Sequence, residues 1–114
     1  MAFTPRLVMV TASSQEEACH LAQGLLSKHL VACVNLVPGI ESHYWWQGKL
    51  EASTEVLMLI KTSAEQFEAV AEHVRGHHSY ECPEIIALVP EQMAPTYRAW
   101  WEDSMEGQQP PAGP

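Results

Sequence analysis

Residues 40–62 decide the fold, and they read Ile-Glu-Ser-His-Tyr-Trp-Trp-Gln-Gly-Lys-Leu-Glu-Ala-Ser-Thr-Glu-Val-Leu-Met-Leu-Ile-Lys-Thr. Strand-forming residues lie on both sides of Gln47-Gly48, a pair that predicts a two-residue hairpin turn. An unbroken second strand, from Lys49 to Thr62, would span about 46 Å at ~3.3 Å per residue. A single domain of this size has a radius of gyration near ~13 Å. The hairpin therefore either bends at Pro38-Gly39 or projects beyond its own domain.

A projecting hairpin would expose Tyr44, Trp45 and Trp46 along a strand edge, which another chain would have to cover. Trp45 and Trp46 occupy successive strand positions, so their side chains face opposite sides of the sheet. One can pack on its own domain while the other meets a partner. We therefore expect an oligomer, and a closed ring rather than an open filament.

Strand and helix patterns alternate around this hairpin. Continuous apolar runs predict further strands at 7–10, 30–37 and 85–89. Capping boxes at Ser13-Ser14 and at Ser63 introduce two helices, the second of which is expected to end at Gly76. Pro95 suits the first turn of a last helix, whose Trp100 and Trp101 are expected to cover the open sheet face or an interface.

The predicted order is β-α-β-β-α-β plus a terminal helix. Right-handed crossovers and a central hairpin make this an α+β, ferredoxin-like fold: an antiparallel four-stranded sheet with two helices on one face and a long central hairpin. Residues 1–106 are expected to form a single domain. The low-complexity tail, residues 107–114, is predicted to be disordered.

Composition excludes several classes of protein. The chain has 114 residues, with six Lys or Arg against fourteen Asp or Glu, and its net charge of −8 argues against nucleic-acid binding. No segment approaches the roughly 20 apolar residues of a membrane span, and the N-terminal residues lack the apolar core of a signal peptide. Three cysteines without a C-x-x-C motif argue against a disulfide or zinc framework. We expect a reduced, cytoplasmic protein.

The standard enzyme signatures are also absent from the sequence. There is no Gly-rich phosphate loop, no G-x-S-x-G and no H-E-x-x-H motif. No pair of carboxylates can be assigned to general acid and base catalysis from the sequence. We therefore expect a protein that is not an enzyme.

Several short stretches together point to a known family. In chain order they are Val10-Thr11-Ala12, Leu30–Asn35 followed by Val37-Pro38-Gly39, Tyr44–Lys49, Glu55, Lys61-Thr62 and His78–Ile86. Their order and spacing resemble the CutA family, the divalent-cation-tolerance proteins, from about Leu7 to Trp101. The resemblance implies a homotrimer of ferredoxin-like protomers, similar in architecture to the PII signalling proteins. It also implies a role in tolerance of copper and other divalent metals, with no organic cofactor and no established reaction.

His77 and His78 are the strongest candidates for metal ligands. Neutral imidazoles bind copper and zinc well, and this pair lies where the second helix gives way to a loop. Some CutA relatives bind copper through two adjacent histidines here together with a cysteine late in the first strand. The matching position is Val10, which cannot ligate, and Ser79 replaces the family's usual proline. The pair is therefore either a copper(II) or other divalent-metal site, or two solvated loop histidines.

A second group of candidates comes from the resemblance alone. Family members place cysteine, lysine, tyrosine and acidic side chains around a cleft between subunits, and the matching residues are Cys33, Lys61, Tyr80 and Glu84. The group is either a buried charged network that holds the trimer together or the binding site of a PII-like regulatory protein for a small ligand or partner protein. An enzyme that uses Cys33 as its nucleophile ranks last, because no histidine-containing triad is evident.

The remaining histidines and cysteines receive simpler interpretations. His20 and His73 are expected to be exposed to solvent, and Cys19 to pack at the fringe of the first helix's apolar stripe. Cys82 is expected to be a mildly exposed free thiol. The leading hypothesis is therefore a trimeric, non-enzymatic metal-response protein that uses His77 and His78.

Overall fold

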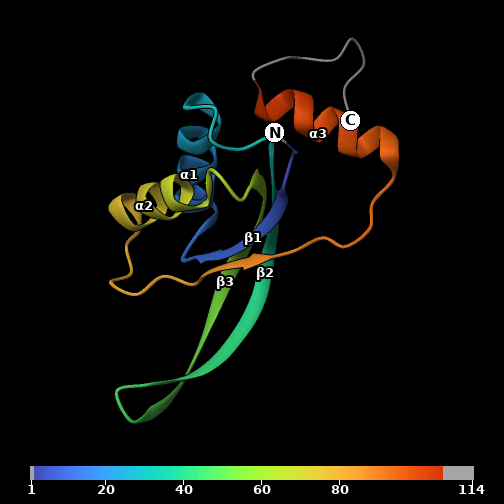
Figure 1. The fold of residues 1–114 in the computed structure, drawn as a ribbon. Coiled ribbons are helices and arrows are strands. Elements are labelled where there is room, and N and C mark those ends of the chain that lie inside the picture. The colour runs from blue at the N-terminus through green and yellow to red at the C-terminus, as the bar shows by residue number, and fades with distance from the viewer. Residues whose placement is uncertain (1, 107–114) are drawn as a thin grey trace.

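The computed structural model describes residues 2–106, which form four strands and three helices (Figure 1). In chain order these are β1 (Pro5–Ala12), α1 (Gln15–Ser27), β2 (Cys33–Trp46), β3 (Lys49–Ser63), α2 (Phe67–His77), β4 (Ile85–Leu88) and α3 (Pro95–Met105). The expected β-α-β-β-α-β order with a terminal helix is confirmed. The tail expected to be disordered, residues 107–114, lies outside the described residues.

The strands form one antiparallel sheet in the order β2-β3-β1-β4. Helices α1 and α2 lie side by side over one face of it, as Figure 1 shows. Their apolar faces meet the sheet in a core that includes Val8, Met58, Ile60, Leu21 and Val74. The ferredoxin-like α+β prediction is therefore confirmed.

Strands β2 and β3 form a long hairpin whose far end projects away from the helices (Figure 1). It closes at Gln47-Gly48, where both residues have positive φ, as a two-residue turn with this twist requires. The β2–β3 register shifts between Val37 and Ile40, so the irregularity expected at Pro38-Gly39 is a bulge within one strand. The molecule measures 48 Å along its longest axis, with a radius of gyration of 14.9 Å. The hairpin both bends and projects.

The boundaries of α2 differ from the sequence prediction. The helix continues through Gly76 and ends at His77, so the expected stop at Gly76 was wrong. A glycine costs a helix only about 1 kcal/mol relative to alanine, which tertiary contacts easily outweigh. The side chain of Ser63 accepts a hydrogen bond from the Gln66 N–H, but this turn precedes the helix, which begins at Phe67.

Helix α3 lies apart from α1 and α2 and contacts β3. The Trp101 side chain is buried, and its Nε1–H donates to the Thr62 carbonyl oxygen at 3.0 Å. Its ring also meets Phe3 edge-on, with centroids 6.1 Å apart. Trp101 therefore anchors α3 to the sheet. Within residues 2–106, no helix is both long enough and apolar enough to span a membrane.

Candidate functional site

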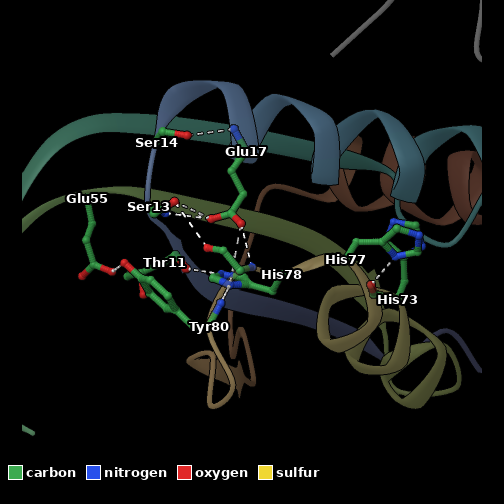
Figure 2. Close-up of polar contacts among 10 residues, drawn as sticks. Thr11, Ser13, Ser14, Glu17, Glu55, His73, His77, His78 and Tyr80 are labelled. Carbon is green, nitrogen blue, oxygen red and sulfur yellow. Dashed lines mark hydrogen bonds and ion pairs between the residues drawn. The ribbon is translucent and has the colours of Figure 1, made fainter.

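His78 follows the last residue of α2, and both of its ring nitrogens are hydrogen-bonded (Figure 2). Nδ1 accepts from the backbone N–H of Tyr80 at 3.0 Å, so the proton of the neutral ring lies on Nε2. Nε2 donates to the carbonyl oxygen of Thr11 at 2.8 Å. The side chain has 0% of its surface exposed. His78 therefore ties the loop after α2 to the end of β1 and has no free nitrogen for a metal ion.

Glu17 holds the same loop against the start of α1. One carboxylate oxygen accepts from the N–H and hydroxyl of Ser13, both at 2.9 Å, and the other accepts from the Ser79 N–H at 2.8 Å (Figure 2). Burial by itself would raise the pKa of Glu17, but these hydrogen bonds outweigh it and lower the pKa to about 2. A proline at position 79 has no N–H and could not make this bond. The serine at this position therefore adds a restraint on the loop.

His77 is the last residue of α2 and differs from His78 in having a free nitrogen. Its Nδ1 lies 2.8 Å from the carbonyl oxygen of His73, an atom that can only accept, so Nδ1 carries the proton (Figure 2). The Nε2 lone pair has no hydrogen-bond partner among residues 2–106, and the side chain is exposed. Of the two adjacent histidines, only His77 can bind a metal ion without losing hydrogen bonds.

His73 is buried, with 8% of its surface exposed, so the expectation of solvent exposure was wrong. The continuation of α2 past Gly76 brings it onto the same helix face as His77, and the two rings stack with centroids 4.2 Å apart. Lys28 Nζ lies 3.3 Å from its Nδ1, and its Nε2 edge lies against Gly24 of α1. Burial, followed by the charges of His77, Lys28 and His20, lowers its pKa.

Cys33 and Lys61 are paired across β2 and β3. Lys61 Nζ donates to Asn35 Oδ1 at 2.6 Å and lies 3.9 Å from Cys33 Sγ. The ammonium group also sits 5.4 Å from the centre of the Tyr97 ring, within cation–π range. The structure thus brings Cys33 and Lys61 together within one chain, near the N-terminal part of α3.

Tyr80 and Glu84 lie at a different place, around a pocket of about 710 Å³. The Tyr80 hydroxyl donates to Glu55 Oε2 at 2.9 Å, and the Glu55 side chain is buried (Figure 2). Burial first, and then the Glu55 carboxylate, raise the pKa of Tyr80 to about 12. The pocket is lined by Thr11, Ser42, His43, Tyr44, Trp46, Glu55, Tyr80, Glu81, Cys82 and Glu84.

Within one chain, the four residues expected at a cleft therefore fall into two groups, with Cys33 and Lys61 in one and Tyr80 and Glu84 in the other. Glu55 was not among the site residues expected from the sequence. An acidic residue directly before the apolar run of β3 was the available signal, and its burial confirms that it is not an ordinary surface carboxylate.

The other predicted side chains agree with the sequence analysis. His20 and Cys82 are exposed, and Cys19 is half-buried on α1. Across residues 2–106, no cluster of three or more His, Cys, Asp or Glu side chains has a geometry that could hold a metal ion. A metal site built from this part of one chain therefore has at most two protein ligands.

Comparison with known proteins identifies a single family. Residues 6–104 match the family described as CutA1 divalent ion tolerance protein. A rice relative, "Protein CutA 1, chloroplastic", is 43% identical over 86% of this chain and 55% of its own length. The "Divalent-cation tolerance protein CutA" of Archaeoglobus fulgidus is 42% identical over 87% of this chain and 96% of its own. The chain thus spans about half the length of the rice relative and nearly all of the archaeal one.

Solved structures agree with this assignment. The structure titled as CutA1 from Oryza sativa superposes with a TM-score of 0.85 at 39% identity, covering 96% of this chain and 98% of that one. The structure titled as the periplasmic divalent cation tolerance protein CutA from Archaeoglobus fulgidus also gives 0.85, at 40% identity, covering 89% of this chain and 98% of that one.

Proposed function

Because the chain belongs to the CutA1 divalent ion tolerance protein family, we propose that it is a homotrimeric divalent-cation tolerance protein that binds metal ions, copper(II) foremost, and is not an enzyme. The relatives are named as tolerance proteins rather than as enzymes. The observation that carries the proposal is the Nε2 atom of His77, an exposed imidazole nitrogen whose ring is held in place by its other nitrogen. Imidazole nitrogen is a good ligand for copper and zinc.

The two adjacent histidines take different parts in this proposal. His77 is the metal ligand, and its Nδ1–H bond to a backbone carbonyl is the kind of outer contact that orients most metal-binding histidines. His78 holds the loop in place through Thr11 and Tyr80 and could ligate only after losing one of these bonds. Position 10 is a valine, which is buried in the core and has no atom that can bind a metal ion. The ligand that some relatives supply from this position therefore has no counterpart here.

The homotrimer is supported by the hairpin. Trp45 and Leu50 are paired across β2 and β3, and the two residues are 71% and 68% exposed. Large apolar side chains that pair on an exposed sheet are typical of an interface. A cytoplasmic location remains a prediction from the free cysteines, since relatives are named both as periplasmic and as chloroplastic.

Copper(II) titration by calorimetry tests the metal proposal. The wild-type chain is expected to bind copper(II) stoichiometrically, and a His77→Ala, His78→Ala double variant is expected to lose that binding. The single variants separate the two roles. His77→Ala should lose binding with a small change in melting temperature, whereas His78→Ala, which removes two hydrogen bonds to other segments, should lower the melting temperature more. His29→Asn, which removes an exposed histidine that lies outside the pocket, is the matched control. Unchanged binding in the double variant would refute the site.

The second candidate is a PII-like regulatory or scaffold trimer that binds a small ligand or partner protein at an inter-subunit cleft. The pocket beside Tyr80 and Glu84 favours it, because its volume suits a small molecule. Its lining includes three glutamates and no lysine or arginine, so a cationic ligand fits it better than a nucleotide. Cys33 and Lys61 would join the pocket only from a neighbouring subunit. Thermal-shift measurements with divalent metals, organic amines and nucleotides separate the two functions. A response to metals alone argues against the PII-like regulatory function.

A further inference from the structure

We propose that His20 of α1 is the second protein ligand of the metal site at His77, so that copper(II) binds between α1 and α2 rather than in the loop at His78. This inference rests on the proposed metal-binding function and specifies its ligands. The rings of His20 and His77 lie with centroids 6.3 Å apart and planes at 58°, and both side chains are exposed. The two residues are 57 positions apart in sequence and meet because α1 and α2 pack together.

The spacing of the two rings suits a shared ion. A ligating imidazole nitrogen lies about 2.0 Å from zinc, and copper(II) is similar, so two rings that bind one ion have centroids about 5 Å apart at a tetrahedral angle and about 6 Å apart on opposite sides. The separation of 6.3 Å lies slightly above this range, so the rings must approach each other by a few tenths of an ångström to share an ion. A small rotation of the exposed His20 side chain would bring a nitrogen of its ring toward Nε2 of His77.

His77 is already oriented for this role. Its Nδ1–H bond to the His73 carbonyl fixes the tautomer, leaves the lone pair on Nε2 and restricts rotation of the ring. The ring also stacks on the His73 ring, with centroids 4.2 Å apart, so the His73 ring blocks movement of the His77 ring on that side. The position at the C-terminal end of α2 adds a favourable interaction with a cation, because the helix dipole is negative there.

His73 itself is a positioning residue and not a ligand. It is buried, its Nδ1 lies 3.3 Å from Lys28 Nζ, and its Nε2 edge faces the backbone of Gly24. No cluster of three ligands occurs in the described part of the chain. The site therefore has two histidine ligands, and water completes the coordination of the ion, as suits copper(II) with nitrogen and oxygen ligands.

Calorimetric titration of the full chain with copper(II) tests this assignment. His20→Ala and His77→Ala should each weaken binding at least about tenfold, since even residues that only support a ligand contribute a factor of 10 to 100. Alanine favours the helix at position 20, so the His20 variant should fold normally. The matched control is His29→Asn, which removes an exposed histidine at φ 56°, a conformation that asparagine tolerates.

The outcomes distinguish this inference from the function on which it rests. Loss of binding in His77→Ala, with wild-type affinity in His20→Ala, would overturn the His20 assignment and leave the metal-binding function standing. Absence of copper binding by the wild-type chain would overturn both. Equal weakening in His29→Asn would show non-specific histidine binding and also overturn the assignment. Electron paramagnetic resonance gives an independent readout: nitrogen couplings from two imidazoles in the wild type should fall to one in His20→Ala.

Discussion

At the scale of single residues, the hydrogen bonds of each imidazole decide what it can do. His77 and His78 are adjacent and chemically identical, yet one has an exposed lone pair and the other has both nitrogens occupied. The difference comes from the backbone atoms that they meet, a carbonyl of α2 for His77 and the end of β1 for His78. Glu17 strengthens the arrangement, because it holds Ser13 and Ser79 together and so fixes the loop that carries His78.

Substitution of Glu17 by glutamine should destabilise the protein at neutral pH. The pKa of Glu17 is lowered from 4.5 to about 2, so ionisation favours the folded state. This contribution is fully present above pH ~4.5 and is lost as the pH falls toward 2. It amounts to at most about 3 kcal/mol in the free energy of unfolding. Thermal melts of wild type and Glu17→Gln at pH 7 and pH 2.5 should show a clear difference at pH 7 that shrinks at pH 2.5. An equal difference in melting temperature at pH 7 and pH 2.5 would contradict a stabilising role for the ionised Glu17 carboxylate.

At the scale of elements, the contact between α1 and α2 depends on one small residue. Gly24 lies where the two helices meet, and a Cβ built on it would come within 2.5 Å of His73 Nε2. His73 cannot easily yield, because it is buried, stacked on His77 and close to Lys28. The spacing between His20 and His77 therefore depends on an absent side chain, which explains a glycine in the interior of a helix.

The Gly24→Ala variant should be less stable than the wild type even though alanine favours helices. The gain in helix propensity is about 1 kcal/mol, whereas overpacking costs about 1 to 3 kcal/mol. Chemical denaturation measures the effect of Gly24→Ala on the free energy of unfolding in two backgrounds, the wild type and His73→Ala. With His73→Ala also present, the clash disappears and Gly24→Ala should become neutral or stabilising. The same destabilisation in both backgrounds would show that His73 is not the obstacle.

At the scale of the whole molecule, one chain has more sheet than it can cover. Helices α1 and α2 lie over one face, α3 contacts β3 at Thr62, and the far end of the hairpin projects with Trp45 and Leu50 exposed. The net charge of −8 per chain triples to −24 in the proposed trimer, which strengthens the case against nucleic-acid partners. It is compatible with attraction of cations.

Light scattering on the purified chain should give a mass of about 38 kDa, three times the 12.7 kDa of one chain. A Trp45→Lys, Leu50→Lys variant places two positive charges on the paired strand positions, where they repel each other and resist burial, so the mass should fall toward that of a monomer. Gln23→Lys, on an exposed position of α1, is the control and should stay trimeric. A monomeric wild type would rule out the trimer.

The sequence by itself determined the order of strands and helices, the hairpin turn at Gln47-Gly48 and the family. These follow from local patterns, because turn residues, caps and apolar periodicity act over a few neighbouring positions. The same patterns misplaced the end of α2, since a glycine's local cost is small beside the contacts of a packed helix.

Only the tertiary structure decided which histidines are available. The Nε2–H of His78 donates a hydrogen bond to the carbonyl oxygen of Thr11, 67 positions earlier in the chain. His73 is buried against Gly24 of α1 and Lys28, the residue that caps α1. It also separated Cys33 and Lys61 from Tyr80 and Glu84 within one chain, and it brought Glu55 to the pocket. The free lone pair of an imidazole depends on atoms far away in sequence, so a local motif can locate a histidine but cannot show whether its nitrogen is free.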